Sequence, residues 1–238
     1  MPVARVSALK ATTLFVGFTI YFVILLHTLL PLLKDNVRLN PALYWFITGY
    51  VLFIPMFVYS IAAARKEGNH EAKSVAKALN LRGLSRKDLL YSVTGLLVVF
   101  VFTGIIFAVA SLLQSYYGVR PLSTTPWFME IQAFRGTEVL LLAVWLPMFF
   151  FNIVGEELLW RGYIQTRLQG KYAWLYCSLL WLVFHIPFGL DLMIMLVPVA
   201  LVIPYVFEKT RNTMTGIFIH GLYNGPVFVM VALGLIAH

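Results

Sequence analysis

Ionisable and amide side chains recur at helical spacing in the second half of an otherwise apolar chain. Asn152, Glu156 and Glu157 lie in one short stretch, and Arg161 follows Glu157 by four residues. Residues four apart meet on one face of a helix, whereas adjacent residues lie about 100° apart. Glu157 therefore has a cation beside it and Glu156 has none, while Asn152 lies one turn before Glu156 on the same face. The spacing predicts a structural Glu157–Arg161 pair and a Glu156 that is free for chemistry.

Two histidines extend this set of polar residues. His185 stands alone in an apolar run, and His220 is followed by Asn224 four residues later. A carboxylate, two histidines and an amide on three separate segments could build a site that activates water. Glu156 would be the general base, a histidine would orient or share the proton, and further donors would hold an oxyanion. The alternative is a buried polar network that only fastens helices together.

The other isolated polar residues have simpler interpretations. We expect His27 to be a hydrogen-bonded interior residue, Asp191 to be a helix cap or an interface residue, and Cys177 to be a small packing residue. Cys177 is the only cysteine, which excludes an intrachain disulfide and any multi-cysteine zinc or iron–sulfur site.

Membrane helices are the elements that must position these side chains. Of the 238 residues, 61% are hydrophobic and 12% are charged, about half the charged share of a soluble domain. Long uncharged stretches exceed the roughly 20 residues that a helix needs to cross a bilayer. We expect an all-α, polytopic transmembrane helical bundle of about seven to eight spans, forming a single membrane domain over 1–238. Seven spans are drawn at 11–33, 42–64, 89–113, 137–160, 172–189, 191–207 and 213–236.

The distribution of Lys and Arg predicts how the bundle is oriented. With the N-terminus inside, fourteen of the 18 Lys and Arg residues lie in inner segments, and four lie in outer ones. Because these residues favour the cytoplasmic side, we expect a cytoplasmic N-terminus and an external C-terminus in the cell membrane. The net charge of +8 is then a topology signal, and no nucleic-acid partner is expected. The basic loop 65–88 is either a surface helix on anionic lipid or a solvated loop.

Three motifs resemble those of the CPBP family, which comprises the type II CAAX prenyl endopeptidases and their bacterial relatives, also called Abi proteins. The family pattern is EExxxR, then FxxxH, then HxxxN, and the matching residues here are Glu156-Glu157-x-x-x-Arg161, Trp181-x-x-x-His185 and His220-x-x-x-Asn224. The motifs occur in the family's order, and the resemblance covers roughly 137–236. Trp181 stands where the family usually has Phe, a difference that bears on the shape of the substrate pocket, where we place this residue.

The resemblance implies an intramembrane endopeptidase that acts on a membrane-associated protein or peptide. Glu156 and His185 would activate the hydrolytic water, His220 and Asn224 would stabilise the oxyanion, and Glu157 and Arg161 would support the site. The spacing adds Asn152 as a supporting residue that can hydrogen-bond Glu156. Eukaryotic-type members of the family are viewed as glutamate-dependent and metal-free. No cofactor is expected here, because Asn224 on the face of His220 suits a pair of oxyanion donors better than a metal shell. The alternative mechanism is a zinc site held by Glu156, His185 and His220.

Other functions compatible with these residues remain as alternatives. One is a catalytically silent membrane scaffold or bacteriocin-immunity-type protein. Another is a proton-coupled transporter, which predicts inverted repeats with matching broken helices; the sequence shows no such pairing. For an enzyme, the residues allow prenylated proteins, peptide pheromones or bacteriocins, and sorting-signal tails as substrates.

Overall fold

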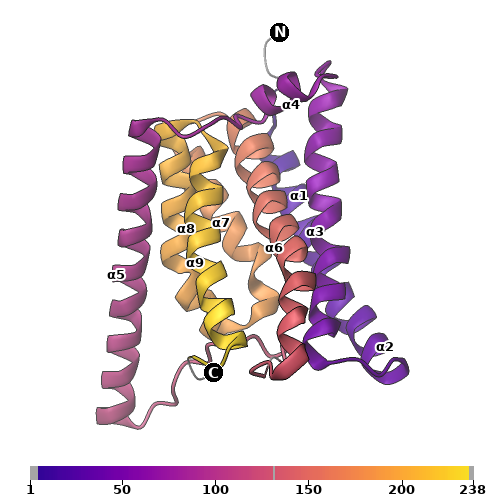
Figure 1. Cartoon of the computed structure of the whole chain (residues 1–238). Helices are drawn as coiled ribbons and strands as arrows, with labels where there is room; N and C mark the ends of the chain where they lie inside the picture. Colours follow the sequence, from indigo (N-terminus) through magenta and orange to yellow (C-terminus); the bar gives the residue numbers. More distant parts are fainter. Residues whose placement is uncertain (1–4, 131, 236–238) are drawn as a thin grey trace.

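Long apolar helices run roughly parallel or antiparallel to one another in the computed structural model, which describes residues 5–130 and 132–235 (Figure 1). The α-helices are α1 (Ala8–His27), α2 (Leu29–Asn36), α3 (Pro41–Lys66), α4 (Ala72–Ala78), α5 (Arg86–Tyr117), α6 (Leu141–Glu157), α7 (Ala173–Phe184), α8 (Leu190–Thr210) and α9 (Thr213–Ala232). Three short helical segments complete the described part, namely η1 (Gly136–Leu140), the π-helix η2 (Leu158–Gln165) and η3 (Ile186–Phe188).

Six helical segments in the described part are long and apolar enough to cross a membrane. They are Ala8–Asn36, Pro41–Lys66, Arg86–Tyr117, Gly136–Gln165, Leu190–Thr210 and Thr213–Ala232. The prediction of an all-α, polytopic helical bundle is confirmed. The helices α5, α8 and α9 pack together, and α3 packs against α6 and η2.

The segment predicted as a span at 172–189 differs from the other predicted spans. Its helix α7 has 12 residues, which at 1.5 Å per residue gives about 18 Å, well short of the roughly 30 Å of a hydrocarbon core. Helix α7 ends at Phe184 because Pro187 has no N–H to continue the α-helical hydrogen bonds, and the chain goes on as the short 3₁₀ helix η3. Gly189 then adopts a φ of +91°, which a side chain would oppose. The break therefore places His185 at a helix end within the bundle.

The segment predicted as a span at 137–160 is, in contrast, longer in the structure than predicted. After Glu157 the helix continues as the π-helix η2 and ends at Gln165. Arg161, which we placed in a cytoplasmic loop, is consequently inside the bundle and only 1% exposed. π-Helical turns often accompany functional sites, and this one follows directly after the two adjacent glutamates.

Side chains cap the N-termini of four helices. The backbone N–H of Lys10 donates to Ser7 Oγ at the start of α1, and Asn40 and Asn212 accept in the same way at α3 and α9. At α5, Ser85 and Asp88 form a reciprocal capping box. Each cap satisfies backbone donors that the first helical turn leaves unpaired, so these polar residues define where the apolar spans begin.

The basic loop 65–88, which contains α4, closes one end of the bundle, called the 65–88 end below. Arg167 donates to Glu67 at 2.6 Å and to the carbonyl of Ala78 at 3.2 Å. Thr213 Oγ1 donates to the carbonyl of Leu79 at 2.6 Å. The loop is thus tied to the segment that follows η2 and to the start of α9. Helix α4 confirms that the loop has helical structure.

The loop 118–135 lies at the opposite end, called the 118–135 end below, where α9 finishes (Figure 1). Arg120 forms an ion pair with Asp191 at 2.6 Å, and the backbone N–H of Ser123 donates to the same carboxylate at 2.9 Å. Trp127 Nε1 donates to the carbonyl of Pro187 at 2.8 Å. Asp191 therefore joins the first turn of α8 to this loop.

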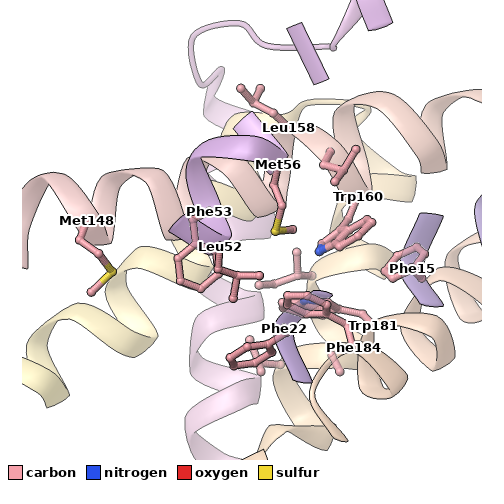
Figure 2. Close-up of a cluster of buried hydrophobic side chains, with 14 of the residues drawn as sticks. Phe15, Phe22, Leu52, Phe53, Met56, Met148, Leu158, Trp160, Trp181 and Phe184 are labelled. Carbon is pink, nitrogen blue, oxygen red and sulfur yellow. The ribbon is translucent and has the colours of Figure 1, made fainter. Parts of the chain in front are cut away.

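Aromatic side chains fill the interior between α1, α7 and η2. Phe15 stacks on Trp160 with ring centroids 3.9 Å apart, and Phe184 meets Trp160 edge-on at 5.5 Å. Figure 2 shows these three rings within the buried hydrophobic cluster. Cys177 is 1% exposed and packs in the same core, as predicted. The prediction for His27 is wrong: this side chain is exposed at the end of α1 and stacks on Trp127.

Candidate active site

A cavity of about 620 Å³ lies between α3, α5, α6, α8, α9, η3 and the loop 118–135. The structure brings five of the predicted polar residues to its wall, namely Asn152, Glu156, His185, His220 and Asn224. The remaining lining is mainly aromatic and aliphatic, as is typical of pockets in which a few polar groups orient a ligand.

Glu156 is the only carboxylate among the residues that line this cavity. It is 2% exposed, and each of its oxygens accepts one hydrogen bond. Asn152 Nδ2 donates to Oε1 at 2.8 Å, and Trp181 Nε1 donates to Oε2 at 2.7 Å. The Asn152 contact follows from the spacing of four residues on α6. The two donors fix the carboxylate in one orientation, while each oxygen keeps a further lone pair.

Trp181 is not among the residues that line the cavity, and its place in the substrate pocket stays a prediction. The side chain is 2% exposed and belongs to the buried hydrophobic cluster (Figure 2). Its ring lies 3.7 Å from the guanidinium carbon of Arg161, an arrangement with cation–π character. The indole N–H meanwhile reaches Glu156. The family's usual Phe could fill the same space but could not donate this hydrogen bond.

Both histidines hold their Nδ1 atoms against acceptors. His185 Nδ1 lies 2.8 Å from the carbonyl oxygen of Trp181, and His220 Nδ1 lies 3.0 Å from Glu157 Oε1. A carbonyl oxygen can only accept, so Nδ1 of His185 carries the proton. In the neutral ring its Nε2 is then a free lone pair. His185 at the end of α7 can therefore accept a proton through Nε2.

Glu157 and Arg161 lie beside the cavity wall without lining it. Arg161 Nε is 3.4 Å from Glu157 Oε2, and the two side chains are 1% and 0% exposed. Gly216 on α9 allows this arrangement, because a Cβ at that position would overlap Glu157 Oε2. Glu157 thus contacts the cation of its own helix with one oxygen and His220 with the other. The two adjacent glutamates consequently have different environments.

Asn224 lies on α9 one turn after His220, and its half-buried side chain faces the cavity. Its amide makes no side-chain hydrogen bond to any residue that the structure describes. An unengaged amide at the wall of an apolar cavity is available to a ligand.

Sequence reasoning missed the parts of the cavity wall that come from the N-terminal half and from the loop 118–135. Helix α5 contributes Phe100, Thr103, Gly104 and Phe107, and the loop contributes Thr124 and Met129, among others. The spacing of the four α5 residues places them on one helical face. No residue of distinctive chemistry marks that face, so the pattern resembles any packing surface.

Residues 138–225 match the model of the family described as type II CAAX prenyl endopeptidase Rce1-like. This segment contains all three motifs, from Glu156 to Asn224, and the match confirms the family resemblance predicted from them. A comparison with curated proteins finds no match, and a comparison with solved structures finds none either. The match supports a membrane-embedded protease.

Proposed function

We propose that the protein is an intramembrane endopeptidase that hydrolyses peptide bonds of membrane-associated substrates. The observation that carries the proposal is the convergence of Glu156, His185, His220 and Asn224 on one cavity, although they come from α6, α9 and the end of α7. A network that only fastened helices together would bond these groups to one another. Here Asn224 and Nε2 of His185 are left facing the cavity. The family match over 138–225 supports the same function.

Glu156 is proposed to take the proton of the attacking water. The oxygen of the water bonds to the scissile carbonyl carbon while the water loses a proton to Glu156. His185 Nε2 orients the water or shares that proton. When the carbon–nitrogen bond breaks, the proton passes to the leaving amine. Asn152 keeps the carboxylate aimed at the cavity through its 2.8 Å hydrogen bond. General acid–base assistance of this kind contributes about 10²–10⁴-fold to a rate.

His220 and Asn224 are proposed to hold the oxyanion of the tetrahedral intermediate. Asn224 can donate from its amide. His220 already directs Nδ1 toward Glu157 Oε1 at 3.0 Å, so it donates from Nε2 only when the ring carries both protons. The carboxylate of Glu157 lies where it can balance the charge of that imidazolium. Glu157 and Arg161 would thus support the oxyanion site without touching the substrate.

Replacing Glu156 by Gln tests the identity of the base. We expect cleavage to fall by at least about 100-fold, with near-normal expression and insertion because Gln has the same size. The assay is cleavage of internally quenched peptides with an apolar core by purified protein in proteoliposomes. Glu157→Gln is the matched control because it alters the adjacent carboxylate. Full activity in Glu156→Gln with loss in Glu157→Gln would reverse the assignment.

An inactive but folded wild-type protein would contradict the peptidase proposal. If this folded protein cut neither the apolar-core peptides nor prenylated peptides, we would conclude that it is a catalytically silent scaffold.

The proposed mechanism uses no metal. In the part of the chain that the structure describes, no three His, Cys, Asp or Glu side chains are grouped so that they could hold a metal ion. This arrangement of the described side chains supports the metal-free proposal over the alternative zinc set of Glu156, His185 and His220.

We expect purified protein to retain activity after treatment with chelators and to contain no stoichiometric metal. Elemental analysis and assays after dialysis measure both. About one zinc per chain, lost together with activity in His185→Ala and His220→Ala, would contradict the metal-free mechanism and would leave the peptidase assignment intact.

A further inference from the structure

The proposed catalytic residues lie at the inner end of the cavity. Helix α6 runs toward the 65–88 end, and all its other lining residues precede Glu156. Helix α9 runs the opposite way, and all its other lining residues follow His220. The lining residues of α8 fall within the first seven positions of that helix. The cavity therefore extends from the catalytic residues in one direction only, toward the 118–135 end (Figure 1).

Beyond Glu157 the structure is densely packed. All eight residues of η2 are buried, and Gln165 Nε2 donates to the carbonyl of Pro204 at 2.8 Å. A Cβ at Gly162 would lie 2.8 Å from the carbonyl oxygen of Leu79, so the loop 65–88 touches the helix directly. In the described part of the chain, no residue of η2 or of the loop 65–88 lines the cavity, so the cavity does not extend to the 65–88 end.

The opposite end of the cavity reaches the surface of the protein. Thr124 of the loop 118–135 lines the cavity and is exposed. No Lys or Arg is among the residues that line the cavity. Such a wall suits a peptide with apolar side chains and disfavours a charged one, since an unpaired charge is costly to bury.

The two ends of the bundle carry different charges. With Arg161 buried in η2, thirteen of the 18 Lys and Arg residues remain at the 65–88 end, and four lie at the other end. Because Lys and Arg favour the cytoplasmic side of a membrane, this distribution makes the 118–135 end the external one. The cavity mouth is at that end.

We infer that the site takes an apolar peptide segment from the external side of the membrane. The inference rests on the proposed peptidase function, and it names the substrate of the same site: an extended, uncharged stretch of peptide presented at the outer face. Segments that reach the protein only from the cytoplasm would meet the packed side of η2 and not the mouth of the cavity.

Thiol labelling determines the side of the mouth without any assay of activity. Single cysteines are placed in a Cys177→Ala background, at Thr124 in the mouth and at Lys73 on the exposed surface of α4. A membrane-impermeant maleimide added to intact cells should label Thr124→Cys and leave Lys73→Cys unlabelled until the membrane is opened. The reverse pattern would overturn the inference, whether or not the protein cleaves peptides.

Blocking the mouth then tests the route of the substrate. A bulky maleimide attached to Thr124→Cys should abolish cleavage of an internally quenched peptide that has an apolar core and charged, impermeant ends. Ser115→Cys, at the same end on the exposed surface of α5, is the matched control and should retain its activity after labelling. Unchanged cleavage by labelled Thr124→Cys would overturn the inference.

Oriented membrane vesicles separate failure of the inference from failure of the function. The same peptide should be cut by right-side-out vesicles and should remain intact outside inside-out vesicles. Cleavage only by inside-out vesicles would overturn external access while supporting the peptidase. Absence of cleavage by both kinds of vesicle, with correctly labelled Thr124→Cys, would overturn the proposed function and this inference with it.

Discussion

Glu156 and Glu157 are adjacent in the sequence, yet they belong to two different regions of the molecule. On the cavity side, Glu156 meets uncharged donors and an open volume lined by aromatic residues. On the packed side, Glu157 meets Arg161 and His220, and Gly216 closes over it. The rotation of about 100° per residue along a helix separates the two environments.

The difference shows how one turn of helix can divide stability from chemistry. Glu157 and Arg161 on the packed side are buried against each other and do not line the cavity, so their removal should mainly affect folding. Asn224 and His185 on the cavity side keep a donor or a lone pair that no described residue occupies, so their removal should mainly affect turnover. His220 connects the two sides, because it lines the cavity while its Nδ1 contacts Glu157.

The largest expected effect on the packed side comes from breaking the Glu157–Arg161 pair. Either Glu157→Ala or Arg161→Ala leaves the other charge buried and unpaired, which costs about 3–5 kcal/mol. The double variant should be no less stable than the worse single variant. Thermal unfolding in detergent measures all three.

The partly exposed pair of Glu208 and Arg211, which are 25% and 50% exposed, provides the control. Glu208→Ala should cost less than about 1 kcal/mol, as is usual for surface pairs. Additive losses at Glu157 and Arg161 would show that the two residues do not interact.

On the cavity side, Asn224→Ala should reduce kcat with little change in KM. A donor that contacts the oxyanion acts on the transition state, and removing one costs about 2.7–4 kcal/mol in well-studied hydrolases. Steady-state kinetics with the quenched peptides measure the effect, and Tm should change little. Asn224→Asp keeps the shape but cannot donate, so it should be as slow as Asn224→Ala. An increase in KM alone would assign Asn224 to substrate binding.

Sequence patterns predicted the elements whose causes are local. The uncharged stretches predicted the membrane helices, and the spacing of four residues predicted that Asn152 contacts Glu156 and that Arg161 contacts Glu157. The length of α7 was harder to predict, because the apolar run continues through His185 while Pro187 and Gly189 end the helix.

Contacts between segments distant in the sequence could not be predicted in this way. The cavity wall from α5, the loop that closes the 65–88 end and the hydrogen bond from Trp181 to Glu156 depend on tertiary packing. His27 was misplaced for a related reason. Helix α1 ends at His27, which leaves the imidazole ring at the surface, and Trp127 of the distant loop 118–135 stacks on that ring.

The smallest change in kcat is expected at Trp181, which contacts both the packed side and the cavity side. Trp181 stacks under Arg161 on the packed side and donates to Glu156 on the cavity side. Trp181→Phe keeps an aromatic ring and removes only the donor, so kcat should fall by up to about tenfold, or about 1.4 kcal/mol, with KM and Tm nearly unchanged.

Trp160→Phe is the matched control, because Trp160 is fully buried in the same cluster and its Nε1 has no hydrogen-bond partner among the described residues. It should therefore leave kcat unchanged. An equal loss of kcat in both variants would mean that Trp181 acts through packing alone, and the hydrogen bond to Glu156 would then have no role in positioning the base.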